Sequence, residues 1–284
     1  AMGEHGPREF AIVESISGLF VIDGSGSHVD ANLSFSKQAA PFMKIGRPGP
    51  EGANARESMM HVAADTGTWA RFSFSRAEAL EFIKTMAGKS FDTEVKRAKK
   101  ELGFHPIKDF AQLFTGDFLI SCHDGIADCV IAIGAGKPSK TERAMKGLLG
   151  SLSKLSKKVH FEHDRRAVIG APKGSVFLTT SVFEQATTER GRIDAKAERL
   201  DLAKVYWGVR PDLLLIGLTP HGVKRAMKRM TTEKTTWTSP IAGEHTPPIG
   251  FDDKTSIAAH QELSELSSMV RQLLAVARHT LPAK

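Results

Sequence analysis

The feature that most constrains this chain is a pair of short apolar runs, Phe118–Cys122 and Asp128–Gly134, joined by a polar turn. Both runs have the length of a strand, and they hold the two cysteines of the chain. A polar turn between two such runs favours a β-hairpin. Helical patterns precede and follow it, so the stretch from Leu102 to Gly136 is the segment around which the fold can be organised.

The hairpin is predicted to have one apolar face. Alternation puts these side chains on it: Phe118, Ile120 and Cys122 in the first strand, and Cys129, Ile131 and Ile133 in the second. A two-residue turn at Asp124-Gly125 makes the cysteines diagonal neighbours, and a four-residue loop from Asp124 to Ala127 sets them directly opposite. A three-residue loop would separate them onto opposite faces. We expect the apolar face to belong to the core.

The two thiols have three interpretations. They could form a Cys122–Cys129 disulfide in an exported protein, lie reduced as small buried hydrophobes, or act in redox chemistry. The chain has no Cys-x-x-Cys motif, and two cysteines alone cannot complete a structural zinc site. A disulfide and a reduced pair both stay open, and catalysis is the least favoured.

The order of patterns along the chain predicts an α+β fold, with mainly antiparallel sheet and helices packed on one face. Strands are expected at residues 9–22, 28–36, 69–74, 159–164, 165–170, 175–181 and 203–209, besides the hairpin. Ser75 and Glu78 form a capping box before a helix whose apolar face comprises Ala79, Leu80, Phe82, Ile83 and Met86. Further helices are expected at 93–102, 140–155, 221–230 and 261–279, and residues 181–200 are expected to be helical or irregular.

Three units are predicted. Residues 1–58 form an N-terminal β-hairpin segment that packs on the main body, because the stretch 45–56 is rich in proline and glycine. Residues 59–200 form a central α+β unit, and residues 201–284 form a C-terminal unit that ends in an amphipathic helix. A loose similarity between residues 18–36 and 249–264 is compatible with two related halves.

The net charge of +7 suggests contact with anionic surfaces. Two basic helical segments carry the candidate residues: Lys137, Lys140, Arg143, Lys146, Lys154, Lys157, Lys158, Lys224, Arg225, Lys228 and Arg229. The simpler interpretation is a solvated helix face. Nucleic acid is disfavoured as a partner because neither segment interleaves aromatic residues that could stack on bases.

Candidate catalytic and metal-binding residues are few. His160, Glu162 and His163 supply metal-ligand chemistry, although the adjacent Arg165 and Arg166 favour an exposed, charge-balanced turn. The hairpin tip offers an acid–base group in His123, Asp124 and Asp128. Phosphate-loop, nucleophile-elbow and His-Glu-x-x-His motifs are absent from the sequence. No metal ion or other cofactor is therefore expected.

The sequence leaves the compartment open. No apolar run approaches the roughly 20 residues of a transmembrane helix. The first ten residues lack the apolar core of a signal peptide. An exported protein and a cytoplasmic one are both compatible with these observations.

Short motifs in the middle of the chain resemble those of uncharacterised bacterial exported proteins. They are an Ala-Asp-Thr start, a Gly-Phe-x-Pro-x-Lys-Asp connection and a glycine that opens the next strand. The matching residues are Ala64, Asp65, Thr66, Gly103, Phe104, Pro106, Lys108, Asp109 and Gly116. The resemblance, which is to periplasmic or lipoprotein-type chains, implies an envelope setting and repeated α+β units, with no known activity.

Together these observations favour a non-catalytic bacterial cell-envelope protein that serves as a binding or interaction module. Its expected partner is another envelope protein or an anionic surface. One alternative is a metal-dependent or hydrolytic enzyme built on His160, Glu162 and His163 or on the hairpin tip. The other is a module that binds anionic surfaces through its basic helices.

Overall fold

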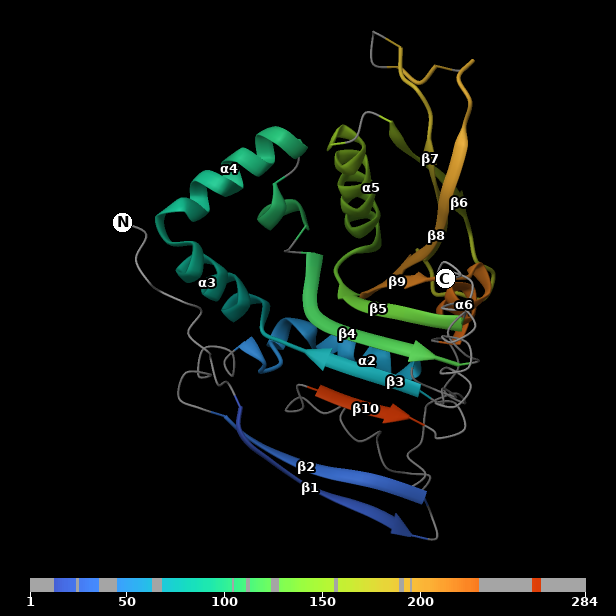
Figure 1. Cartoon of the computed structure of the whole chain (residues 1–284). Helices are drawn as coiled ribbons and strands as arrows, with labels where there is room; N and C mark the ends of the chain where they lie inside the picture. The colour runs from blue at the N-terminus through green and yellow to red at the C-terminus, as the bar shows by residue number, and fades with distance from the viewer. Residues whose placement is uncertain are drawn as a thin grey trace, which may run out of the picture.

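The computed structural model of the chain is drawn in Figure 1. It describes residues 13–23, 26–35, 45–62, 68–103, 105–110, 113–123, 128–155, 158–188, 192–194, 196–229 and 257–261. Residues 230–256 and the expected C-terminal helix, apart from Gln261, lie outside this part of the chain.

An eight-stranded antiparallel sheet forms the centre of the molecule, with the strand order β10-β3-β4-β5-β9-β8-β7-β6. Its strands are β3 (Thr68–Ser73), β4 (Phe114–Cys122), β5 (Cys129–Ala135), β6 (Val159–Arg166), β7 (Val176–Glu184), β8 (Leu200–Arg210), β9 (Leu213–Gly217) and β10 (Ile257–Gln261). The α+β class and the antiparallel pairing are confirmed. The last described strand, β10, returns to the far edge and pairs with β3.

The expected N-terminal hairpin forms a separate two-stranded sheet of β1 (Val13–Asp23) and β2 (Gly26–Phe35), visible in blue in Figure 1. The two strands pair from Val13–Phe35 to Asp23–Gly26. In this hairpin the predicted strand ends at residues 22, 28 and 36 lie within two residues of the observed ones, and the predicted start at residue 9 lies outside the described residues.

The helical elements are η2 (Pro50–Gly52), α2 (Ala53–Val62), α3 (Arg76–Ala87), η3 (Gly88–Ser90), α4 (Phe91–Leu102), η4 (Pro106–Phe110), α5 (Pro138–Leu155) and α6 (Pro220–Arg229). Ser75 caps α3 as predicted, because its side chain accepts a hydrogen bond from the Glu78 backbone N–H. The expected apolar face of α3 is not buried, however: Ile83 is 50% exposed and Met86 is 73% exposed.

Helices cover both faces of the sheet, whereas the sequence predicted one. Met59 of α2 and Met227 of α6 lie in the same apolar cluster on one face. Met145 of α5 packs against a second cluster, built around Trp207 and Leu214, on the other face. Interior strands that bury both faces read as continuous apolar runs, so the pattern of β9 does not reveal on which side a helix lies.

The apolar hairpin face is not the side that is buried most deeply. The structure confirms the hairpin and pairs Cys122 with Cys129, which is the register of the four-residue loop. Leu119 and Ala132, on the opposite face, are fully buried beneath α2 and α6. Ile120 and Ile131, on the face expected to form the core, are 40% and 38% exposed.

Other predictions need correction. The stretch 45–56, whose prolines and glycines favour a loop, instead forms η2 and then α2 from Ala53. The expected strand at 165–170 is the end of β6, because Arg165 and Arg166 pair with β7 and the chain then turns. β7 continues to Glu184, inside the range expected to be helical or irregular. These differences arise where β-branched or polar composition fits several states until a neighbouring strand pairs with the segment.

The boundaries between the predicted units fall inside regular elements. Residues 58 and 59 both lie in α2, and residue 200 is the first of β8. β8 and β9, assigned to the C-terminal unit, pair with β7 and β5 of the central unit in one sheet. A relation between two halves of the chain stays a prediction.

Candidate functional site

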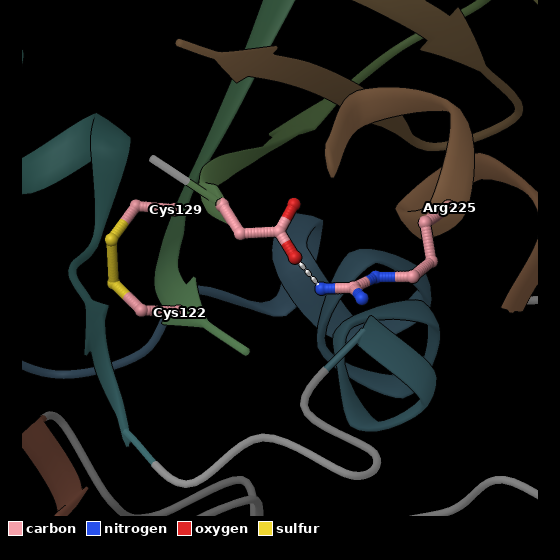
Figure 2. Close-up of a disulfide and its surroundings, with 4 residues drawn as sticks. Cys122, Cys129 and Arg225 are labelled. Carbon is pink, nitrogen blue, oxygen red and sulfur yellow. Dashed lines mark hydrogen bonds and ion pairs between the residues drawn. A yellow bond between two sulfur atoms is a disulfide. The ribbon is translucent and has the colours of Figure 1, made fainter. Parts of the chain in front are cut away.

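The hairpin tip carries a disulfide between Cys122 and Cys129, whose Cα atoms are 4.0 Å apart (Figure 2). Asp128, a candidate acid–base residue, forms a close ion pair with Arg225 of α6. This ion pair links the hairpin to the helix that covers it. It also places Arg225, a candidate for anionic-surface binding, against a carboxylate of the same chain. Asp124, the other acidic candidate of the tip, lies outside the described residues.

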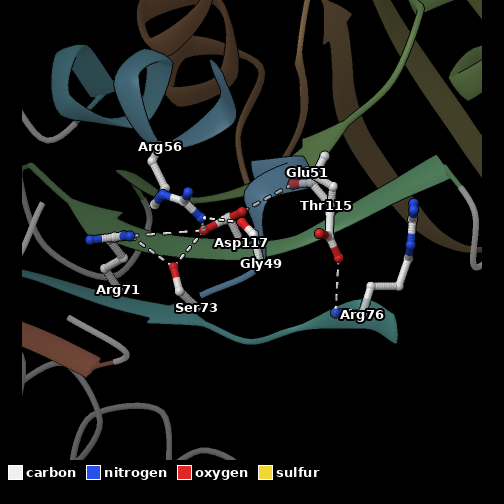
Figure 3. Close-up of polar contacts among 8 residues, drawn as sticks. All are labelled: Gly49, Glu51, Arg56, Arg71, Ser73, Arg76, Thr115 and Asp117. Atoms are coloured by element: carbon white, nitrogen blue, oxygen red, sulfur yellow. Dashed lines mark hydrogen bonds and ion pairs between the residues drawn. The ribbon is translucent and has the colours of Figure 1, made fainter. Parts of the chain in front are cut away.

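A buried polar network lies at the other end of β3 and β4 (Figure 3). Asp117 accepts hydrogen bonds from Ser73 at 2.5 Å and from Arg56 at 3.3 Å. Arg71 donates to the Ser73 hydroxyl at 2.8 Å and lies 3.8 Å from the Asp117 carboxylate. Burial raises the pKa of Asp117, and the contacts with Ser73 and Arg56 oppose this effect.

The network joins three segments that are distant in sequence. Arg56 also donates to the carbonyl of Gly49 at 3.0 Å, which ties α2 to the preceding turn. A Cβ atom built on Gly52 would lie 1.6 Å from the Asp117 carboxylate, so only glycine fits there. Arg71 and Asp117 are each 1% exposed. Because these charges are enclosed, their arrangement serves to hold α2 on the sheet.

The three candidate metal ligands do not converge. A ring nitrogen of His160 lies 3.0 Å from the Gln185 carbonyl, and Glu162 accepts a hydrogen bond from Arg199 at 3.0 Å. His163 contacts the hydroxyl of Thr180 instead. Within the described residues, no group of three or more histidine, cysteine or acidic side chains could hold a metal ion.

His163 belongs to a small, partly buried chain of hydrogen bonds. Trp207 donates its indole N–H to the Thr180 hydroxyl at 2.8 Å, and that hydroxyl lies 2.8 Å from Nδ1 of His163. The hydroxyl can then donate its single hydrogen to the ring, which favours a neutral imidazole with its proton on Nε2. Burial, with a contribution from Lys146, lowers the pKa of His163.

The basic candidates lie on two sides of the sheet. On α5 and the residue before it, Lys137, Lys140 and Arg143 are exposed, whereas Lys146 pairs with Glu142 at 2.7 Å. On α6, across the sheet, Lys224 lies 4.9 Å from the centre of the Phe177 ring, and Lys228 is exposed. Lys158 is also exposed. Lys157 and the side chains of Lys154 and Arg229 lie outside the described residues. The candidates therefore do not form one continuous surface.

The most distinctive open surface is the α5-side face of β3, β4 and β5. Phe72, Ile120 and Ile131 come from three successive strands and are 41%, 40% and 38% exposed. Ile120 pairs directly with Ile131, and Phe72 pairs with Phe118 next to Ile120. We call Phe72, Ile120 and Ile131 the open face. Exposed apolar side chains that are contiguous on a sheet mark interaction surfaces more often than single ones do.

A stacked aromatic pair and the disulfide lie next to the open face in the chain, and a basic helix packs on the same side of the sheet. Phe118 stacks on Phe74 with ring centres 5.6 Å apart, and the disulfide follows Ile120 and precedes Ile131 by two residues. α5, on the same side of the sheet, contains four basic residues and one acidic residue. The sequence pattern placed Ile120 and Ile131 on one face, but it assigned that face to the core and did not connect Phe72 with it.

No described helix is long and apolar enough to cross a membrane. Comparison with protein-family models, with curated proteins and with solved structures gave no match to this chain.

Proposed function

We propose that this protein is a non-catalytic interaction module of the bacterial cell envelope, and that its open face binds a protein partner. The observation that carries the proposal is the exposed Ile120–Ile131 pair on two interior strands. Strands inside a sheet normally have such side chains covered, and an uncovered pair gains hydrophobic free energy when a partner buries it.

The chemistry of the partner follows from the surroundings of the face. Lys140 and Arg143 are exposed on α5, on the same side of the sheet, and the chain as a whole has a net charge of +7. Complementary charge favours a partner that presents an apolar segment flanked by acidic residues. A second copy of the same basic surface would be repelled.

The envelope setting has separate support. Disulfides persist in oxidising compartments and are rare in the cytosol. Protein recovered from its native host with rapid thiol trapping should contain the Cys122–Cys129 disulfide. Free thiols in that material would contradict the proposed compartment while leaving the open face to be tested on its own.

The binding proposal is tested with a photo-crosslinking amino acid at position 131 of the full chain, in the native host. The captured protein is identified by mass spectrometry and purified, and its Kd is measured. We expect Ile120→Glu to weaken binding at least tenfold. Leu202→Glu is the matched control, because Leu202 is 49% exposed on a distant part of β8.

Three outcomes would overturn the proposal. They are crosslinks only to residues 262–284 of the same chain, crosslinks only to a second copy, and a purified partner that binds the Ile120→Glu variant as tightly as the unmodified protein. The first would make the open face an internal packing surface. The second would make it a self-association surface.

A further inference from the structure

A second polar site lies where the β7–β8 ladder ends, on the side of the sheet that α2 and α6 cover and opposite to the open face. Val176 pairs with Val209 at the end of the ladder, so Ser175 and Arg210 are the next residues of the two neighbouring segments, and the Ser175 backbone N–H donates to the Pro172 carbonyl. Arg210 alternates with Gly208 and pairs with Leu213, so its side chain lies on the face that α6 covers.

Arg210 is buried and Ser175 is half-buried, and both have enclosed polar atoms that make no hydrogen bond. The Ser175 hydroxyl and the Nε and Nη1 atoms of Arg210 are enclosed and have no hydrogen-bond partner. Arg210 is 6% exposed, and no ion pair between described residues includes it. Most buried polar atoms in proteins have a hydrogen-bond partner, so these three atoms have hydrogen-bonding capacity left for a ligand or for water.

The local charge is positive. Burial lowers the pKa of Arg210 to about 10, and the acidic Asp212 of the β8–β9 turn opposes this effect only in part. At neutral pH the guanidinium is therefore still charged. Lys224 of α6 lies above the ring of Phe177, and Phe177 is two residues after Ser175 in the chain. Lys173 is exposed in the turn before Ser175.

We propose that Ser175 and Arg210 form a binding site for an oxyanion group, a carboxylate or a phosphate. The guanidinium donates through a planar fork that matches the oxygens of such a group, and the serine hydroxyl adds a further donor. An anion there would neutralise an enclosed charge that is otherwise costly to bury. The site is independent of the open face, which lies on the opposite side of the sheet.

Inorganic phosphate and acetate are the probes, each titrated into the full chain against chloride at equal ionic strength. We expect one of the two to shift the Nε–H resonance of Arg210 in a saturable way and to raise the Tm. Comparing the two anions shows which oxyanion the site prefers. The resonance reports on the unmodified protein, so it does not depend on how a variant folds.

Variants then assign the site. Arg210→Met should fold, because it replaces a buried charge with an apolar side chain of similar length, and it should abolish the saturable shift in Tm. Ser175→Ala should weaken binding severalfold. Arg199→Met is the control, since Arg199 is exposed and pairs with Glu162 and Asp201. The proposal is overturned if neither anion gives saturable binding, or if Arg210→Met binds as the unmodified protein does. In the first case, ordered water alone would satisfy these atoms.

Discussion

At the scale of single residues, Asp117 shows how one buried carboxylate can connect separate parts of the chain. It accepts hydrogen bonds from Ser73 of β3, Arg56 of α2 and Thr115 of its own strand. Its partners are up to 61 positions away in sequence. No local pattern indicates such a network, because a single acidic residue in a strand looks the same whether it faces solvent or two arginines.

Replacing the Asp117 carboxylate by an amide tests this role. Asp117→Asn keeps the shape and one acceptor oxygen but leaves Arg56 and Arg71 without their shared counter-charge. Breaking a buried ion pair costs about 3–5 kcal/mol, so we expect the free energy of unfolding in urea to fall by about 3 kcal/mol. Glu101→Gln is the control, since the Arg97–Glu101 pair is exposed and should contribute little to stability. Equal effects of the two changes would show that the network does not stabilise the fold.

At the scale of elements, sequence reasoning was most reliable for the hairpin of β4 and β5. Alternation gave both strands and the shared face of Ile120 and Ile131, and an even loop allowed the cysteines to meet. It could not indicate which face would be buried, because that depends on α2 and α6, which come from residues 53–62 and 220–229. α2 itself was hidden by the prolines and glycines that precede it. Ile120 and Ile131 of the open face were therefore placed on one face correctly but assigned to the core, and Phe72 was not connected with them.

The disulfide is expected to stabilise this hairpin directly. Cys122 and Cys129 are seven positions apart, and Cys122 is 3% exposed. For so short a loop, the loss of chain entropy in the unfolded state corresponds to about 2.5 kcal/mol. The double variant Cys122→Ala, Cys129→Ala should lose about that much free energy of unfolding, measured in urea.

The reductant dithiothreitol provides the control for that measurement. It should lower the stability of the unmodified protein by a similar amount and leave the double variant unchanged. If reduction changed the two proteins equally, the effect would not come from this bond.

At the scale of the whole molecule, one edge of the sheet is formed by a strand from the far end of the described chain. β3 to β5 and β6 to β9 follow one another along the chain, whereas β10 crosses back to pair with β3. Sequence order favours pairing between neighbours, so this long-range contact could not be predicted. It makes the N-terminal edge of the sheet depend on residues 257–261.

Two truncated chains separate the role of β10 from that of the residues after it. A chain that ends at Thr255 lacks β10 and exposes the edge of β3, whereas a chain that ends at Gln261 keeps the ladder from Ile257–Phe72 to Gln261–Thr68. We expect the free energy of unfolding of the shorter chain to be about 2 kcal/mol lower than that of the longer one, because each backbone hydrogen bond contributes roughly 0.5–1.5 kcal/mol. It should also self-associate, since an unpaired edge is a template for another strand. Urea denaturation and light scattering after size exclusion measure both effects. If the two truncated chains have the same stability and the same mass in solution, β10 does not protect this edge.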